Sequence, residues 1–241
     1  MEKKLLVDRK KGTIWFALID SENLNQKKTI TMAKLAERNH ASAILVGGST
    51  IVDQTELDNI IKTLKRITKI PVILFPGNIT GISQFADAIL FTSLLNSDNP
   101  YFITQAQVLG SLAVKKYNLE AIPTGYIIIG DGGTTGFIGR ARGLPPDKPQ
   151  ITAMYSLAAQ YMGMRFVYLE AGSGAVSHIS PEIIRATKQV YNGFLIVGGG
   201  IRDANTAKSI TKAGADAIVI GTMLEKESSV QLTSIIKAIQ Q

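Results

Sequence analysis

The chain has 241 residues, a formal net charge of +7 at pH 7 and no cysteine, and 45% of its residues are hydrophobic. These values are typical of a soluble globular protein with one large domain or two small ones. The lack of cysteine excludes a disulfide framework, a zinc–cysteine site, an iron–sulfur cluster and a thiol nucleophile, and it fits a reducing, cytoplasmic location. With only two histidines in the chain, a histidine-rich metal site is excluded as well.

The amino-terminal residues lack the apolar core of a signal peptide, and no run approaches the roughly 18 apolar residues of a transmembrane helix. The excess of positive charge suits nucleic acid, an anionic membrane surface or phosphorylated small molecules. Basic residues cluster at 3–11 and 62–69 but are otherwise scattered, without an RNP-like aromatic motif. We therefore expect a solvated basic surface and no nucleic-acid partner.

Eight short apolar runs alternate with amphipathic segments along the chain. The runs are 14–20, 43–49, 72–77, 88–95, 121–130, 165–171, 194–200 and 217–222. Several are almost continuously hydrophobic, which favours strands covered on both faces, as in a parallel sheet. Helices are predicted between them, over 29–38, 53–68, 104–117, 151–162, 181–190, 203–213 and 226–239.

Repeated alternation of strand and helix indicates a (β/α)8 TIM barrel, with a doubly wound open sheet as the alternative. We expect one domain over 1–241, because no linker or shift in composition divides the chain. One unit breaks the pattern, since only the segment 78–87, rich in poor helix formers, separates the third and fourth strands. The third helix is therefore expected to be lost or replaced by a loop. A second segment, 130–147, is predicted to be a long loop, and such loops are often functional.

The active site of a barrel lies where the strands end and the following loops begin. The last three predicted strands are followed by Gly172-Ser173-Gly174, Gly199-Gly200 and Gly221-Thr222. Glycines let backbone N–H groups approach an anion, and barrel phosphate sites are frequently built from the loops after strands seven and eight. The alternative is that these glycines only permit tight turns. Because three such loops share one rim, we predict a phosphate site.

Two carboxylates, Asp20 and Glu170, end otherwise apolar strands. A carboxylate in such a position is costly unless it is paired or bound to a metal. Magnesium takes one or two carboxylates together with phosphate oxygens, so Asp20 is a Mg²⁺ candidate, with Ser49 on the adjacent strand. The alternative for Asp20 is a helix N-cap.

Glu170 is placed to orient or deprotonate a substrate hydroxyl, and the alternative is an ion pair with Arg165 or Arg202. Tyr168 has the same side-chain parity as Glu170, so both are expected to point into the barrel.

These strand ends resemble those of the archaeal geranylgeranylglyceryl phosphate synthases. The stretch at 168–175 reads Tyr-Leu-Glu-Ala-Gly-Ser-Gly-Ala and is quite specific, whereas the glycine motifs at 197–202 and 221–222 are shared with many phosphate-binding barrels. The resemblance extends over essentially the whole chain and includes 18–20, 46–49, 71–77 and 123–126. It implies a modified TIM barrel whose third helix is replaced by irregular structure.

The resemblance also implies an activity: a Mg²⁺-dependent prenyltransferase that joins sn-glycerol 1-phosphate to geranylgeranyl diphosphate through an ether bond, releasing diphosphate, in archaeal-type membrane lipid synthesis. By this resemblance Asp20 and Ser49 would bind Mg²⁺, and Tyr168 and Glu170 would position the attacking hydroxyl. The residues that would hold glycerol phosphate are Tyr168, Leu169, Glu170, Ala171, Gly172, Ser173, Gly174, Gly199, Gly200, Gly221 and Thr222. A homo-oligomer, dimer or hexamer, is expected, and peripheral contact with a membrane is compatible with this activity.

One departure from the family pattern follows the first strand. The family commonly has Asp-Pro-Asp/Glu-Lys there, whereas 20–23 of this chain read Asp-Ser-Glu-Asn, so the basic residue is missing. Arg140 and Arg142 are candidates to replace it. The fourth strand, 89–95, and Tyr126 are candidates to line a prenyl groove, or belong to the barrel core.

Three other functions are compatible with the sequence. A bacterial heptaprenylglyceryl phosphate synthase would share every polar site residue and differ in the length of its groove. A phosphosugar isomerase or epimerase would use the same barrel with an acid–base pair at the rim. A basic nucleic-acid-binding module would show salt-sensitive binding to DNA or RNA.

Overall fold

The computed structural model describes residues 1–20, 26–48, 53–225 and 229–240. Eight parallel strands, paired in chain order, form a closed barrel. They are β1 (Ile14–Asp20), β2 (Ala43–Gly48), β3 (Val72–Pro76), β4 (Ala88–Leu94), β5 (Glu120–Ile128), β6 (Phe166–Glu170), β7 (Phe194–Gly198) and β8 (Ala217–Ile220). The predicted TIM barrel is confirmed: seven of the predicted apolar runs contain a whole strand, and β5 begins one residue before its predicted run.

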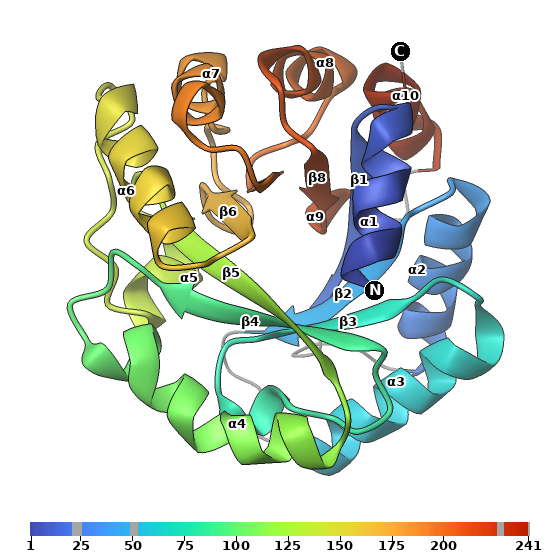
Figure 1. Cartoon of the computed structure of the whole chain (residues 1–241). Helices are drawn as coiled ribbons and strands as arrows, with labels where there is room; N and C mark the ends of the chain where they lie inside the picture. Colours follow the sequence, from blue (N-terminus) through green and yellow to red (C-terminus); the bar gives the residue numbers. More distant parts are fainter. Residues whose placement is uncertain (21–25, 49–52, 226–228, 241) are drawn as a thin grey trace.

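An outer layer of helices surrounds the barrel (Figure 1). It consists of α2 (Gln26–Arg38), α3 (Gln54–Ile67), α4 (Ala106–Lys116), α6 (Pro149–Tyr161), α7 (Pro181–Val190), α8 (Ala204–Ala213) and α10 (Ser229–Ile239). Local chemistry sets several boundaries: Asp53 caps α3 by accepting from the N–H groups of Thr55 and Glu56, and Ser180 caps α7 just before Pro181. Helix α3 then buries one apolar stripe against the sheet.

No α-helix connects β3 to β4. A single 3-10 turn, η3 (Ile79–Gly81), is the only helical turn in this fully described connection. The two strands are also joined over a short length, through the pairs Ile73–Ala88 and Leu74–Ile89. The predicted loss of the third helix is therefore confirmed.

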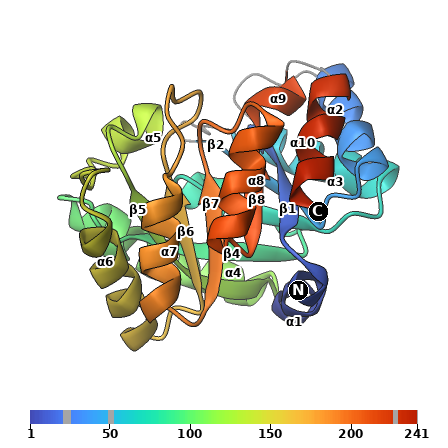
Figure 2. The ribbon, with the colours of Figure 1, turned by 90° about the horizontal axis from the view of Figure 1, so that it is seen from above.

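Five further elements were not predicted. Helix α1 (Glu2–Asp8) and the 3-10 turn η1 (Arg9–Lys11) precede β1, and a five-residue π-helix, η4 (Tyr101–Gln105), leads into α4. Helix α5 (Gly133–Ile138) lies within the segment predicted to be a loop, so that prediction is wrong over these residues. Helix α9 (Thr222–Glu225) follows β8. Figure 2 shows α1 at one end of the barrel and α5 and α9 at the other.

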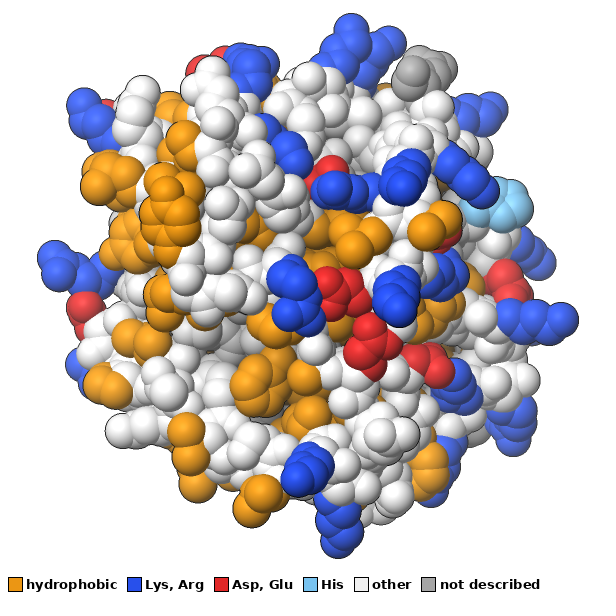
Figure 3. Space-filling model, viewed as in Figure 1, with side chains coloured by type: hydrophobic (Ala, Val, Ile, Leu, Met, Phe, Trp, Pro, Cys, Tyr) orange, Lys and Arg blue, Asp and Glu red, His pale blue; other side chains and the backbone are white. Residues whose placement is uncertain are grey.

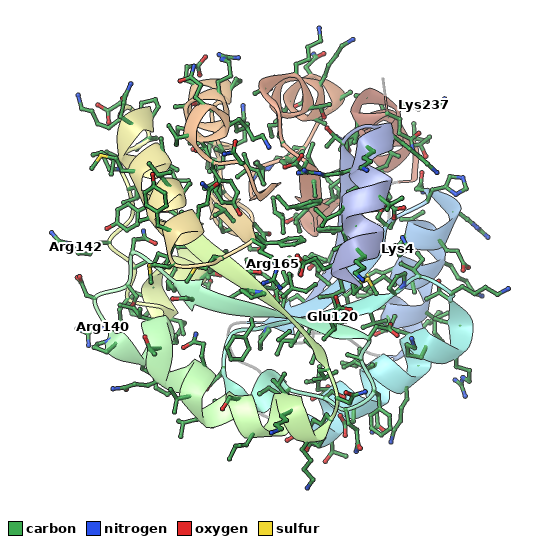
Figure 4. The ribbon with its side chains drawn as sticks, viewed as in Figure 1. Lys4, Glu120, Arg140, Arg142, Arg165 and Lys237 are labelled. Atoms are coloured by element: carbon green, nitrogen blue, oxygen red, sulfur yellow. The ribbon has the colours of Figure 1, made fainter. Side chains whose placement is uncertain are left out.

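Helix α1 closes the amino-terminal end of the barrel. Leu5 is fully buried among the inward-facing side chains of the strands. Arg165, just before β6, donates two hydrogen bonds to the carboxylate of Glu2, at 2.6 and 2.8 Å. Figure 4 shows Arg165 and Glu120 near the centre of this face, beside α1. Within the described part of the chain, no helix is long and apolar enough to cross a membrane.

Candidate active site

A cavity of about 300 Å³ opens at the carboxyl ends of the strands, opposite α1. One part of its wall is polar and includes Asp20, Glu170 and the loops that follow β7 and β8. The other part is apolar and is formed by η3, β4, η4 and α4, with the side chains of Ile79, Ile82, Ile89, Phe91, Phe102 and Ala106. The site therefore joins a polar rim to an apolar arm.

The apolar arm extends beyond the interior of the barrel. Leu90 and Leu94 of β4 pack with the inward-facing core, whereas Ile89 and Phe91 pack with the outer core between strands and helices. All four line the cavity. The cavity thus reaches from the barrel mouth to the outer face of β4, at the place where the third helix is missing.

Glu170 ends β6 with its carboxylate turned toward the cavity and only 6% of the residue exposed. Its Oε1 accepts a 2.6 Å hydrogen bond from the backbone N–H of Gly172. Burial raises the pKa of the Glu170 carboxyl above its ordinary value, and the Gly172 hydrogen bond opposes this shift only in part. The predicted alternative, an ion pair with Arg165 or Arg202, is not formed: Arg165 binds Glu2, and Arg202 donates to backbone carbonyls.

Tyr168 lies two residues before Glu170 and points to the same side of the sheet, as predicted. The residue is fully buried. Burial, followed by the negative charge of Glu170, raises the pKa of the Tyr168 hydroxyl well above its ordinary value, so the phenol stays protonated. This neutral hydroxyl and the Glu170 carboxylate belong to the wall of the same cavity.

Two glycines in the polar rim are required by its geometry. Gly199 has a φ of 86°, and a Cβ there would lie 2.5 Å from Oε1 of Glu170. Gly172 has a φ of 112°, and a Cβ there would lie 2.7 Å from the backbone of Gly132, just before α5. Glycine at these positions lets the loops after β6 and β7 close around the carboxylate.

Arg202 connects two of these loops. Its guanidinium donates to the carbonyl oxygens of Gly174 and Ala175, at 2.6 and 2.9 Å. Arg202 also lines the cavity, and sequence analysis did not single it out as a binding residue. The sequence does contain a feature that could have pointed to Arg202, because this residue directly follows the Gly-Gly-Gly-Ile run at the end of β7.

Most of the predicted site residues converge on this cavity. Its wall includes Asp20, Tyr168, Glu170, Ser173, Gly174, Gly199, Gly200, Gly221 and Thr222. Leu169 and Ala171 instead turn their side chains into the outer core, and Gly172 supports Glu170 through its N–H group. Ser49 lies outside the described residues.

Asp20 is half-buried at the end of β1, where it pairs in register with Gly47 of β2. Its position on the cavity wall puts one carboxylate beside the polar rim. Within the described residues there is no group of three or more acidic or histidine side chains that could hold a metal by themselves. A single carboxylate such as that of Asp20 fits a Mg²⁺ ion that takes the rest of its coordination from a phosphorylated substrate. It fits poorly an ion that is enclosed by protein ligands alone.

Arg140 and Arg142, the candidates to replace the missing basic residue after β1, lie outside the cavity wall. Both lie away from the barrel axis, as Figure 4 shows, and neither lines the cavity. Arg142 is 80% exposed in its side chain and faces Asp98 at 3.9 Å. Arg202 is the basic side chain that the described cavity wall contains.

Helix α5 supplies a part of the wall that sequence analysis missed. Thr134, Thr135 and Ile138 of this helix line the cavity. Asp131 supports its start by accepting from the N–H of Gly133 at 3.1 Å. The segment was recognised as long and glycine-rich, but its residues are weak helix formers and gave no helical pattern.

A TIM barrel whose strand ends join a glycine-rich polar rim to an apolar arm is typical of an enzyme class that handles a phosphorylated and a hydrophobic group together. Residues 7–239 match the PcrB family. The chain belongs to this family, within the group of the geranylgeranylglyceryl phosphate synthases, and the predicted resemblance is confirmed.

Two archaeal relatives illustrate the similarity. The geranylgeranylglyceryl phosphate synthase of Nitrosopumilus maritimus is 58% identical over 233 residues, which cover 96% of this chain and 93% of the relative. That of Cenarchaeum symbiosum is also 58% identical, over 94% of this chain and 92% of the relative.

Solved structures show the same similarity to geranylgeranylglyceryl phosphate synthases. The crystal structure of (S)-3-O-geranylgeranylglyceryl phosphate synthase from Thermoplasma acidophilum, in complex with its substrate sn-glycerol-1-phosphate, matches with a TM-score of 0.95 and 37% identity. The match covers 99% of this chain and 97% of that one. A tryptophan synthase alpha chain from Legionella pneumophila, 14% identical with a TM-score of 0.64, shares only the barrel fold.

Proposed function

We propose that this protein is a geranylgeranylglyceryl phosphate synthase. It transfers the geranylgeranyl group of geranylgeranyl diphosphate to a hydroxyl of sn-glycerol 1-phosphate and releases diphosphate. One observation carries the proposal: a glycine-rich polar rim and an apolar arm belong to the same cavity, which Glu170 also lines. The near-full-length identity to synthases of this name supports the same assignment.

The polar rim suits glycerol phosphate. Gly199, Gly200, Gly221 and Thr222 all face the cavity, and α9 begins at Thr222. Phosphate sites in TIM barrels are frequently formed by the loops after strands seven and eight together with the start of a short extra helix. With the phosphate held there, Glu170 and Tyr168 lie where the glycerol hydroxyls would be.

The apolar arm suits the prenyl chain. A C20 chain has no polar group beyond its diphosphate, so it gains free energy from transfer into an apolar groove in proportion to the area buried. Phe91, Ile82 and Ala106 provide such a surface, and the arm is long because it continues past β4 to α4. A phosphosugar isomerase would have no use for this part of the cavity.

The residues that would hold Mg²⁺ are Asp20 and, outside the described residues, Ser49. Bound together with the diphosphate, the ion would neutralise the charge of the leaving group. The remaining polar groups act directly on the acceptor: Glu170 orients the attacking hydroxyl and takes its proton, and the neutral phenol of Tyr168 donates a hydrogen bond. Catalysis then rests mainly on positioning and on the electrostatics of a buried site.

A radiolabelled transfer assay tests the proposal. Purified protein receives labelled sn-glycerol 1-phosphate, Mg²⁺ and either the C20 or the C35 prenyl diphosphate, with and without EDTA. We expect ether product with the C20 donor and none in EDTA. A preference for C35 would assign the heptaprenyl alternative, and no product with either donor would refute the prenyltransferase.

We further propose that the chain assembles into a homo-oligomer, a dimer or a hexamer. Large apolar side chains are exposed on α4, at Leu109 and Leu112, and on α6 and its end, at Met154, Tyr161 and Met162. Figure 3 shows hydrophobic side chains gathered over α6. Light scattering after size-exclusion chromatography checks the mass, and flotation with anionic vesicles checks the membrane alternative.

A further inference from the structure

Three aromatic rings meet inside the cavity, at Phe75, Tyr126 and Tyr168, and are called the aromatic triad below. The Phe75 and Tyr168 rings stack with centroids 5.2 Å apart. Tyr126 meets both rings edge-on, with its centroid 5.3 Å from that of Phe75 and 5.1 Å from that of Tyr168. All three residues line the cavity wall, and Phe75 is the most exposed of them.

The aromatic triad lies between the two parts of the cavity. On one side, the Tyr168 hydroxyl and Oε2 of Glu170 both lie next to Gly198, since a Cβ at that glycine would contact both groups. On the other side, Phe75 belongs to the end of β3, directly before the connection that contains η3 and opens into the apolar arm. The triad is therefore at the junction where the acceptor hydroxyl and the head of the prenyl chain would meet.

The charges at this junction favour a cation. Burial and the charge of Glu170 raise the pKa of both tyrosine hydroxyls well above the ordinary value, so the rings are neutral phenols. Among the described residues of the wall, the only basic side chain is Arg202, which is engaged with Gly174 and Ala175. The faces of aromatic rings carry negative potential and attract a cation within about 6 Å.

The transfer reaction generates such a cation. The bond between C1 of the prenyl chain and its diphosphate oxygen breaks, and the electron pair leaves with diphosphate. The hydroxyl oxygen of glycerol phosphate forms the new bond to C1 and loses its proton to the carboxylate of Glu170. While the first bond is broken and the second incomplete, positive charge is spread over C1 and C3 of the allylic group.

We infer that the aromatic triad, through the exposed ring of Phe75 above all, stabilises the allylic positive charge in the transition state. This inference rests on the proposed function and adds a further catalytic residue to it. Phe75 would thus differ from Phe91, which lines the same cavity in the apolar arm and would contribute only to binding of the chain.

Kinetics of matched substitutions test the inference. Phe75→Leu and Phe75→Met remove the ring and keep an apolar side chain, Phe75→Tyr keeps the ring, and Phe91→Leu makes the same change in the apolar arm. We expect kcat to fall about 10- to 30-fold in the Leu and Met variants, with KM for both substrates changed less than about twofold, and to recover in Phe75→Tyr. Phe91→Leu should instead raise KM for the donor.

A binding measurement separates charge stabilisation from a structural role. A prenyl ammonium, which carries positive charge at the reacting position, and its uncharged isostere are titrated by calorimetry in the presence of inorganic diphosphate. The wild type should prefer the ammonium, and that preference should drop about tenfold in Phe75→Leu and persist in Phe75→Tyr.

An unchanged ammonium preference in both Phe75→Leu and Phe75→Met would overturn the inference. So would a rise in KM with an unchanged kcat in these variants. If the wild type forms no ether product at all, the proposed function itself fails, and the two failures are thus distinguished.

Discussion

Oε1 of Glu170 occupies the space beside Gly199 that a side chain would need, since a Cβ at 199 would lie 2.5 Å away. Gly199→Ala should therefore displace the carboxylate and strain a backbone whose φ is 86°. We expect transfer activity to fall at least about tenfold, because misplacement of a reacting group by about 1 Å costs that much or more. Steady-state kinetics give the activity, and thermal denaturation gives the stability.

Gly163→Ala is the matched control for this change. Gly163 follows α6 with a φ of 84°, and no atom lies within 4 Å of a Cβ there. It should lose about 1 kcal/mol of stability from the strained φ alone, less than Gly199→Ala, and keep wild-type activity. Equal loss of activity in both variants would refute a specific contact between position 199 and Glu170.

Replacing Glu170 with Gln should have opposite effects on activity and stability. Burial raises the pKa of the Glu170 carboxyl, so this group favours folding while it is protonated, and that contribution is lost as pH rises through its folded pKa. The Gln variant should match the wild type in melting temperature near pH 4 and exceed it near pH 8. Its transfer activity should fall about 10²- to 10⁴-fold.

The same titration predicts the pH dependence of catalysis. Activity of the wild type requires ionised Glu170, so kcat/KM should rise with pH through an apparent pKa above that of an ordinary carboxyl group. This acid limb should be absent from the residual activity of Glu170→Gln. A Gln variant that is less stable than the wild type near pH 8 would contradict the assignment of a desolvated carboxylate.

Asp20→Asn tests the proposed metal position. Loss of the charge at the end of β1 should raise the Mg²⁺ concentration needed for half-maximal transfer by more than about tenfold, since carboxylates dominate binding of Mg²⁺ in proteins. Asp98→Asn makes the same change at a 57% exposed side chain outside the cavity and should leave the Mg²⁺ requirement unchanged. Full activity of Asp20→Asn at low Mg²⁺ would remove this residue from the site.

The amino-terminal end of the barrel should affect stability without affecting catalysis. Leu5 of α1 is fully buried among the barrel side chains, so Leu5→Ala should lower the free energy of unfolding by about 2–4 kcal/mol. Val7→Ala, at a 56% exposed position of the same helix, should cost less than about 0.5 kcal/mol. Denaturant titration measures both, and kcat should stay at the wild-type value in each folded enzyme.

The strands and the polar rim could be predicted because each depends on local sequence. Buried parallel strands are continuous apolar runs, so a carboxylate such as Asp20 or Glu170 at the end of one is conspicuous. Strand 89–95 could be named as a candidate lining of the prenyl groove, but the sequence could not separate this role from barrel core, since outward-facing Ile89 and Phe91 have the pattern of residues that pack under a helix. Only the three-dimensional arrangement shows that both residues line the cavity.

Helices α1 and α5 were missed for another reason. Each is short, and α5 consists of Gly-Thr-Thr-Gly-Phe-Ile, which has little intrinsic helical preference. Its conformation depends on tertiary contacts, including the close approach of Gly132, just before α5, to Gly172 in the loop after β6. Such contacts become visible only once the barrel has brought the loops after β5 and β6 together.

The turn η3, which stands in the place of a covering helix, changes where a long substrate can lie. A barrel with a full ring of covering helices would offer a ligand only the space inside its mouth. Here the cavity continues beside β4 between η3 and α4, so the tail of a bound substrate has room outside the barrel interior while its head lies at the rim. The product carries the same tail, and it too can occupy this space without separating any hydrogen-bonded strands.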